Sequence, residues 1–227
     1  MKETPLTIAI PKGKLLDESV SILKNIGLPV KEIRNDSRKM LIEYPQQKIK
    51  YIVCRSADVP TYVEYGASDI GIAGKDIVTE AGRNIFELLD LGFGECKFVL
   101  ALPRRSIPKY KKHNKYDVKK ILSEFPALRV ATKFPNISHT YFKSIGLQAE
   151  IIHLHGNIEL APLVGMAEAI VDIVSTGRTL KENNLAPIDE ISRVSARLVA
   201  NRVSCRLKYS RIKEITDKIE KVLLEGK

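Results

Sequence analysis

The sequence predicts an α/β fold with a parallel-rich sheet, and two features support this prediction. Segments with strand and helix patterns alternate along most of the 227 residues, as in repeated β-α-β units. Residues 169–174 also form the apolar, β-branched run AIVDIV, which is typical of a strand buried on both faces. The chain is long enough for one large or two small domains with cores of their own.

The first half of the chain alternates short apolar runs with helical patterns. In residues 15–26 apolar side chains recur at helical spacing, and Gly27 ends the pattern. Asp58 is a suitable N-cap and Pro60 lies in the first turn, which predicts a second helix up to Gly66. We expect strands at residues 6–10, 40–44, 49–54, 69–73, 86–91 and 97–102.

The second half continues the alternation after a polar, basic excursion at residues 103–115. Pro135 opens a helix that Gly146 stops, and residues 210–224 form a final helix with an apolar face. This face packs either on the chain's own first lobe or on a partner. Other helices are expected over 118–125 and from 159 and 180, with strands at 129–132, 149–154, 169–174, 188–193 and 196–203.

Composition favours anionic ligands and a reducing compartment. The sequence has 37 basic and 27 acidic residues, a formal charge of +10. Nucleic acid is one possible anionic partner, but no recognition helix or aromatic platform is visible, and the basic tract 104–120 suits a solvated loop and helix start. The cysteines at 54, 96 and 205 are isolated from one another, as in proteins of a reducing compartment. The sequence shows no signal pattern and no apolar run of membrane-spanning length. We therefore expect a cytoplasmic protein without a membrane partner.

A turn rich in hydroxyl groups and glycine follows the strand expected at 169–174. A strand, such a turn and a helix start together aim backbone N–H groups at a phosphate. Asp172 would repel a phosphate but suits hydrogen bonds from sugar hydroxyls. The pattern therefore predicts a ribose 5-phosphate cradle, and the alternative is an ordinary turn in which Ser and Thr are caps. The cradle residues are Ser175, Thr176, Gly177, Arg178 and Thr179.

Other candidate patterns are weaker. The lysines of the turn P-K-G-K (11–14) could contact phosphates or could be ordinary surface residues. The Gly74-Lys75 pair does not belong to a P-loop, because Asp69 and Asp76 stand where glycine and Ser or Thr are required. His153 and His155 have no carboxylate or cysteine at ligand spacing, so no metal site is expected there.

Six blocks of sequence resemble ATP phosphoribosyltransferases, the enzymes that open histidine biosynthesis. These blocks are D-I-V-S-T-G-R-T-L (172–180), R-V-A-T-K-F-P (129–135), G-N-I-E-L-A-P (156–162), D-V-P-T-Y-V-E-Y-G (58–66), D-I-G-I-A-G-K-D (69–76) and I-P-K-G-K-L (10–15). The resemblance implies a two-lobed, periplasmic-binding-protein-like fold with the active site in the inter-lobe cleft. It implies a first lobe of residues 1–94 plus 181–227 and a second lobe of residues 95–180. Asn184, where the family often has glycine, is expected in a left-handed turn.

The resemblance also implies a reaction and its site. A phosphoribosyl group would move from phosphoribosyl diphosphate to N1 of ATP, and pyrophosphate would leave with Mg²⁺. The loop after residue 174 would bind the 5-phosphate, with Arg178 its weakest member, and Asp172 and Glu159 would hold the ribose hydroxyls. The first lobe would supply contacts to ATP phosphates or pyrophosphate from Lys12, Gly13, Lys14 and Arg55, and a facing wall from Gly74 and Asp76.

The resemblance is to the short form of the family. Long members carry a C-terminal regulatory domain, for which residues 206–227 leave no room, so a separate regulatory subunit similar to histidyl-tRNA synthetase and a hetero-oligomer are implied. Two other classes of function stay open on the residues alone. One is a solute-binding or effector-sensing domain of the same fold, and the other is a nucleic-acid-binding protein. A solute-binding or effector-sensing domain would not need an aspartate followed by S-T-G-R-T.

Overall fold

The computed structural model describes residues 5–107 and 116–225, which form two compact units. Unit 1 contains the chain up to Gly94 and again from Ser195, and unit 2 is Glu95–Val194. The sequence placed the return to the first lobe at residue 181. The structure places it at Ser195, because β10 (Leu185–Val194) pairs with β6 (Cys96–Pro103) inside unit 2.

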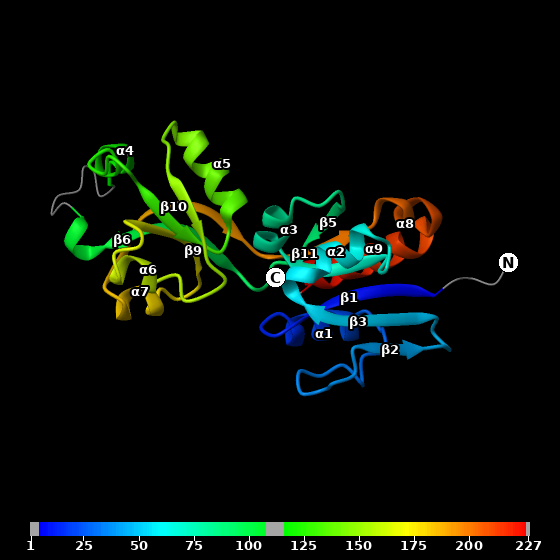
Figure 1. Cartoon of the computed structure of the whole chain (residues 1–227). Coiled ribbons are helices and arrows are strands. Elements are labelled where there is room, and N and C mark those ends of the chain that lie inside the picture. Colours follow the sequence, from blue (N-terminus) through cyan, green and yellow to red (C-terminus); the bar gives the residue numbers. More distant parts are fainter. Residues whose placement is uncertain (1–4, 108–115, 226–227) are drawn as a thin grey trace. The chain divides into compact units, whose positions relative to one another are not determined.

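Unit 1 is built on a six-stranded mixed sheet (Figure 1). The central strand β1 (Leu6–Lys12) lies parallel to both of its neighbours, β3 (Ile49–Arg55) and β4 (Ile70–Gly74). The remaining pairs are antiparallel and involve β2 (Leu41–Tyr44), β11 (Ala196–Ala200) and β5 (Phe86–Asp90), in the order β2-β3-β1-β4-β11-β5.

Helices cover both faces of the unit 1 sheet. On one face, α1 (Leu16–Asn25) and α9 (Tyr209–Glu225) share an apolar core with the strands, and Ile212, Ile215 and Ile219 of α9 are buried there. The apolar face of the final helix therefore packs on its own unit. On the other face, α2 (Val59–Glu64) and α3 (Lys75–Ala81) pack on the sheet. Asn201 caps α8 (Arg202–Leu207), because its side chain accepts hydrogen bonds from the amides of Val203 and Ser204.

Unit 2 is a five-stranded sheet in the order β10-β6-β9-β7-β8 (Figure 1). Its parallel part consists of β7 (Arg129–Thr132), β8 (Glu150–His153) and β9 (Ala169–Val174). One face packs on α6 (Leu160–Leu163) and α7 (Arg178–Glu182), through Ile158, Ala161 and Leu180. Phe98 of β6 contacts Phe134, next to α5 (Pro135–Ile145). A shorter helix, α4 (Val118–Leu122), precedes β7.

The structure corrects the predicted elements at several points. Both sheets are mixed, since the parallel pairs are confined to β1, β3 and β4 in unit 1 and to β7, β8 and β9 in unit 2. Helices α3 and α8 were not predicted, and the strand expected at 196–203 ends at Ala200. The basic excursion contains a short 3₁₀ turn, Arg104–Ser106, and its residues 108–115 lie outside the described part of the chain.

Candidate functional site

The predicted phosphate loop lies at the carboxyl edge of the unit 2 sheet. Strands β7, β8 and β9 run in the same direction, so the residues that follow them gather at one edge. Ser175, Thr176 and Gly177 form the turn between β9 and α7, and α7 begins at Arg178. The sequence thus placed strand, turn and helix start in the order that the structure has.

Gly177 sets the shape of this loop. Its φ is +75°, in the left-handed region, and a Cβ built on it would meet nothing closer than a Val174 methyl group at 3.8 Å. The hydroxyl of Thr176 accepts a hydrogen bond of 3.5 Å from the Arg178 amide. Within the described residues, the amides of Ser175, Thr176 and Gly177 donate to no protein acceptor. The loop therefore presents backbone N–H groups and exposed hydroxyls to solvent.

The side chains beyond the loop divide into two kinds. Arg178 is 82% exposed, and its Nε donates to Glu182 Oε1 at 2.7 Å along the helix surface. This ion pair holds the Arg178 side chain along the surface of α7. Thr179 is exposed in the first turn of α7. Asn184 has a φ of +54°, which confirms the expected left-handed turn.

Asp172 is a half-buried carboxylate near the end of β9. Alternation along the strand places it on the same face as Ile170, toward α6 and α7. Its Oδ1 accepts a hydrogen bond of 2.8 Å from the Ile173 amide. Burial raises the pKa of Asp172 to about 6; the Ile173 hydrogen bond opposes this shift, the negative charge of Glu159 adds to it, and the positive charge of Lys133 opposes it.

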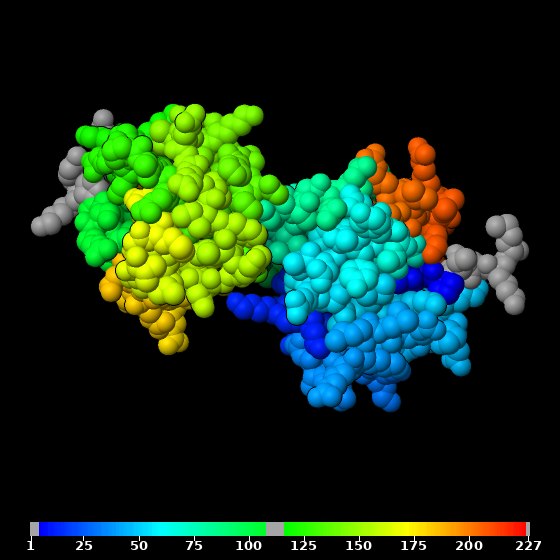
Figure 2. Space-filling model, viewed as in Figure 1, coloured from blue at the N-terminus to red at the C-terminus, as the bar shows by residue number. Residues whose placement is uncertain are grey.

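Glu159 lies close enough to Asp172 for their charges to interact. It is half-buried and occupies the N-cap position of α6. The yellow segment that contains α6 lies at the visible surface of unit 2 (Figure 2). Large apolar side chains are exposed on and just after α6, namely Leu160, Leu163, Val164 and Met166.

Lys133 is a site neighbour that was not singled out from the sequence. It follows β7 directly, and β7 and β9 are paired up to Thr132 and Val171, so the next residues along are Lys133 and Asp172. The signal was present, because Lys133 stands inside the block R-V-A-T-K-F-P, at the carboxyl end of a predicted strand. A lysine at a strand end is common on protein surfaces, so the position of Lys133 beside Asp172 can be recognised only once the order of the strands is known.

The predicted basic residues of unit 1 also gather at a carboxyl edge. Lys12 and Arg55 end the parallel strands β1 and β3 and are paired in register. The Lys12 ammonium donates to the Ser37 carbonyl at 3.0 Å, and Asn35 Oδ1 accepts a 3.1 Å bond from the amide of Gly13, whose φ is +98°. Lys14 and Arg55 are exposed and form no ion pair with any described residue.

Gly74 and Asp76 lie at the same edge of unit 1, where β4 ends and α3 begins. Gly74 is the N-cap of α3 and Asp76 is in its first turn. A Cβ at Gly74 would collide with the carboxylate of Asp76. Because that carboxylate is the end of a flexible side chain, this contact alone does not require glycine at residue 74.

The remaining polar candidates do not form a metal centre. His153 and His155 lie with ring centroids 4.8 Å apart, and β8 ends at His153. Within the described residues, no three His, Cys, Asp or Glu side chains are arranged to hold a metal ion. The three cysteines are free, and burial raises the pKa of the Cys54 thiol to about 11. No helix in the described ranges is long and apolar enough to cross a membrane.

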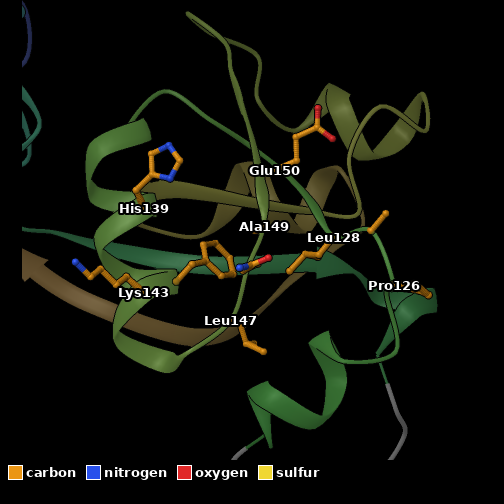
Figure 3. Close-up of a pocket in the computed structure, with 10 residues that line it drawn as sticks. Pro126, Leu128, His139, Lys143, Leu147, Ala149 and Glu150 are labelled. Carbon is orange, nitrogen blue, oxygen red and sulfur yellow. The ribbon is translucent and has the colours of Figure 1, made fainter.

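A pocket of about 660 Å³ lies at the opposite edge of the unit 2 sheet (Figure 3). Leu128 and Glu150 line it at the amino ends of β7 and β8, and His139 and Lys143 line it from α5. The loop after β9, in contrast, lies at the carboxyl edge of the same sheet. The pocket is therefore separate from the candidate site, and His139, which was not expected to be catalytic, belongs to it.

Comparisons with known proteins agree on one family. A family model described as ATP phosphoribosyltransferase matches residues 55–221. The ATP phosphoribosyltransferase of Desulfitobacterium hafniense is 48% identical over 218 residues, which are 96% of each chain. That of Moorella thermoacetica is 48% identical over 221 residues, covering 97% of this chain and 94% of the relative.

Solved structures support the same family and fold. An ATP phosphoribosyl transferase (HisG:HisZ) complex from Thermotoga maritima contains a chain with a TM-score of 0.78 and 35% identity, covering 97% of this chain and 98% of that one. The periplasmic aliphatic sulphonate binding protein SsuA from Escherichia coli has a TM-score of 0.57 at 13% identity, covering 98% and 73%. The second similarity concerns the fold alone.

Proposed function

The chain belongs to the ATP phosphoribosyltransferase family, and on this basis we propose how its residues divide the work of the reaction. The enzyme transfers the phosphoribosyl group of phosphoribosyl diphosphate to N1 of ATP, giving phosphoribosyl-ATP and pyrophosphate. This is the first step of histidine biosynthesis. The resemblance expected from the sequence is confirmed, and so is the likeness to periplasmic binding proteins.

The loop after β9 binds the 5-phosphate in this proposal. The observation that carries it is the set of amides at Ser175, Thr176 and Gly177 without protein acceptors, beside exposed hydroxyls and the first turn of α7. Such donors favour an anion. A side chain at Gly177 would intrude where the phosphate approaches the backbone, and Arg178 contributes through its backbone, since its side chain is paired with Glu182.

Asp172 and Glu159 hold the ribose hydroxyls. One hydrogen bond, from the Ile173 amide, leaves most of the acceptor capacity of Asp172 for the substrate. With a pKa of about 6, Asp172 is mainly ionised at neutral pH. Displacement at the anomeric carbon creates oxocarbenium character, which a nearby carboxylate stabilises. The adenine nitrogen is itself the nucleophile, so substrate positioning and charge stabilisation are sufficient for catalysis.

The anionic oxygens of ATP or pyrophosphate are bound in this proposal by three basic side chains of unit 1, those of Lys12, Lys14 and Arg55. The Gly13 amide lies beside them, and Gly74 and Asp76 lie at the neighbouring strand end. The support is their shared position at the carboxyl edge of the unit 1 sheet, where Lys14 and Arg55 are unpaired among the described residues. Magnesium fits as a companion of the diphosphate. Mg²⁺ is usually bound by one or two carboxylates together with substrate phosphates, and Asp172 and Glu159 are two carboxylates of the proposed site in unit 2.

We also propose a separate regulatory subunit that resembles histidyl-tRNA synthetase and forms a hetero-oligomer with this chain. The Thermotoga structure is of a HisG:HisZ complex, and its matching chain is covered to 98% by this one. The apolar face of α9 is buried in unit 1, so such a partner would use another surface. Activity measured with a histidine titration, with and without the partner, tests this, since full turnover and histidine inhibition by the chain alone would contradict it. Free cysteines fit the proposed cytoplasmic location.

A matched pair of glycine variants tests the phosphate loop. Gly177 and Gly146 both have left-handed φ values, +75° and +70°, and neither has an atom within 3.4 Å of a built Cβ. Gly177→Val and Gly146→Val therefore introduce similar backbone strain, but only the first places a side chain in the proposed phosphate site.

We expect Gly177→Val to abolish nearly all formation of the near-ultraviolet-absorbing adduct from ATP and phosphoribosyl diphosphate. Gly146→Val should keep most of it, and both proteins should remain folded by circular dichroism. Saturable phosphoribosyl diphosphate binding by Gly177→Val at wild-type affinity would contradict the assignment.

A further inference from the structure

Two lysines lie on either side of the strand end that carries Asp172, and their situations differ. On the β6 side, Lys97 is in register with Val174, and its Nζ donates to Glu190 Oε2 at 2.7 Å. On the β7 side, Lys133 is exposed and has no hydrogen bond or ion pair with any residue in the described ranges. A cation that forms no hydrogen bond or ion pair within these ranges, and whose charge reaches a half-buried carboxylate, is available to a ligand.

The order of the strands indicates how a bound phosphoribosyl group would be oriented. The loop after β9 leads into α7, which packs against β10, so the phosphate site lies on the β10–β6 side of the β9 strand end. The ribose hydroxyls on C2 and C3 would face Asp172. Because C1 and C4, which carry the diphosphate and the C5 arm, lie on opposite sides of the ring oxygen, the diphosphate on C1 then extends toward β7, about 4.8 Å away as neighbouring strands are spaced. Lys133 stands at that strand end.

We propose that Lys133 binds the diphosphate on C1 of the substrate and stabilises it as it leaves. This inference rests on the proposed loop and ribose assignments. The bond from C1 to the diphosphate oxygen breaks as the bond from C1 to adenine N1 forms, and the departing diphosphate takes the electron pair. Negative charge therefore grows on the oxygen that Lys133 faces, and an ammonium group there favours the transition state over the ground state.

The test uses two fragments of the substrate and measures binding to the full chain, apart from turnover. Magnesium pyrophosphate probes the Lys133 contact, and ribose 5-phosphate probes the loop and Asp172. Lys133→Met should weaken magnesium pyrophosphate binding by about 10- to 100-fold, the range for losing a charged hydrogen bond, and change ribose 5-phosphate binding less than 2-fold. Lys133→Arg should restore most of the pyrophosphate affinity, because it keeps the charge.

Lys97→Met is the matched control. It removes a lysine from the other flank of the same strand end, one that is already paired with Glu190, and should change neither affinity by more than 2-fold. Unchanged pyrophosphate binding in Lys133→Met, or an equal loss in Lys97→Met, would overturn the inference while leaving the loop assignment intact. Equal loss of both ligands in Lys133→Met would also overturn it, since Lys133 would then act through Asp172. Failure of wild type to bind ribose 5-phosphate would instead overturn the loop assignment, and the inference with it.

Discussion

Asp69 of unit 1 and Asp172 of unit 2 are both carboxylates within the sheet regions, but the protein surrounds them differently. Asp69 is 5% exposed and accepts three bonds, from the Thr7 amide at 2.8 Å, the Ser204 hydroxyl at 2.6 Å and the Lys208 ammonium at 2.7 Å. Asp172 accepts a bond only from the adjoining Ile173 amide within the described residues.

The difference distinguishes a structural carboxylate from one that serves a ligand. The three partners of Asp69 tie the start of β1 and helix α8 to the start of β4, so its charge is compensated inside the fold. Burial of Asp172 is compensated poorly, which is why its pKa rises to about 6. A buried carboxylate that destabilises the fold in this way is typical of a group that gains its hydrogen-bond partners when the substrate binds.

The largest expected effect is on stability, at Asp69. Asp69→Asn removes the carboxylate partner of Lys208, whose ammonium then keeps only its bond to the Pro5 carbonyl among the described residues, and should lower the free energy of unfolding by about 3 kcal/mol, the lower end for breaking a buried ion pair. Turnover per folded molecule should stay near wild type. Urea denaturation and active-site titration measure the two quantities, and normal stability with lost turnover would reverse the roles assigned to the two aspartates.

The same substitution in unit 2 should have the opposite pattern. Asp172→Asn should lower turnover about 100-fold, the scale for losing one charge-stabilising group. It should also raise the free energy of unfolding at pH 8, by up to about 3 kcal/mol, because a neutral amide avoids the burial of a charge whose pKa is shifted to about 6. Normal turnover with lowered stability would make Asp172 a structural residue like Asp69.

The sequence predicted the Asp172 side of this comparison better than the Asp69 side. The run AIVDIV and the following S-T-G are local signals, and they located β9, the loop and its glycine. The partners of Asp69 come from Thr7, Ser204 and Lys208, which are 62 to 139 residues away, and no local pattern indicates them. Asp69 therefore appeared only as the residue that excludes a P-loop and as a member of a family block.

Two other differences have similar causes. Residues 196–203 are apolar and β-branched enough to predict one long strand, but Asn201 caps α8, and an N-cap asparagine was the signal available for that helix. Residues 181–194 were expected in the first lobe because nothing local shows that β10 pairs with β6, which lies about 90 residues earlier. The position of Lys133 beside Asp172 likewise depends on strand order.

The smallest expected effect concerns pH and needs no substrate, so ionisation of the substrate phosphates does not interfere. The pKa of Asp172 in the folded protein, about 6, lies above its ordinary value of 3.8, so the folded state binds this proton more tightly than the unfolded state. The stabilising contribution of the protonated form is fully present below about pH 4 and is lost as pH rises through about 6.

The melting temperature of Asp172→Asn relative to wild type should therefore be highest above pH 7 and fall steadily toward pH 4. Glu159 and Lys133 face the same carboxylate, so Lys133→Met should move the midpoint of this change upward. A difference in melting temperature that stays constant from pH 4 to pH 8 would show that Asp172 titrates normally, and the contrast with Asp69 would then be one of burial alone.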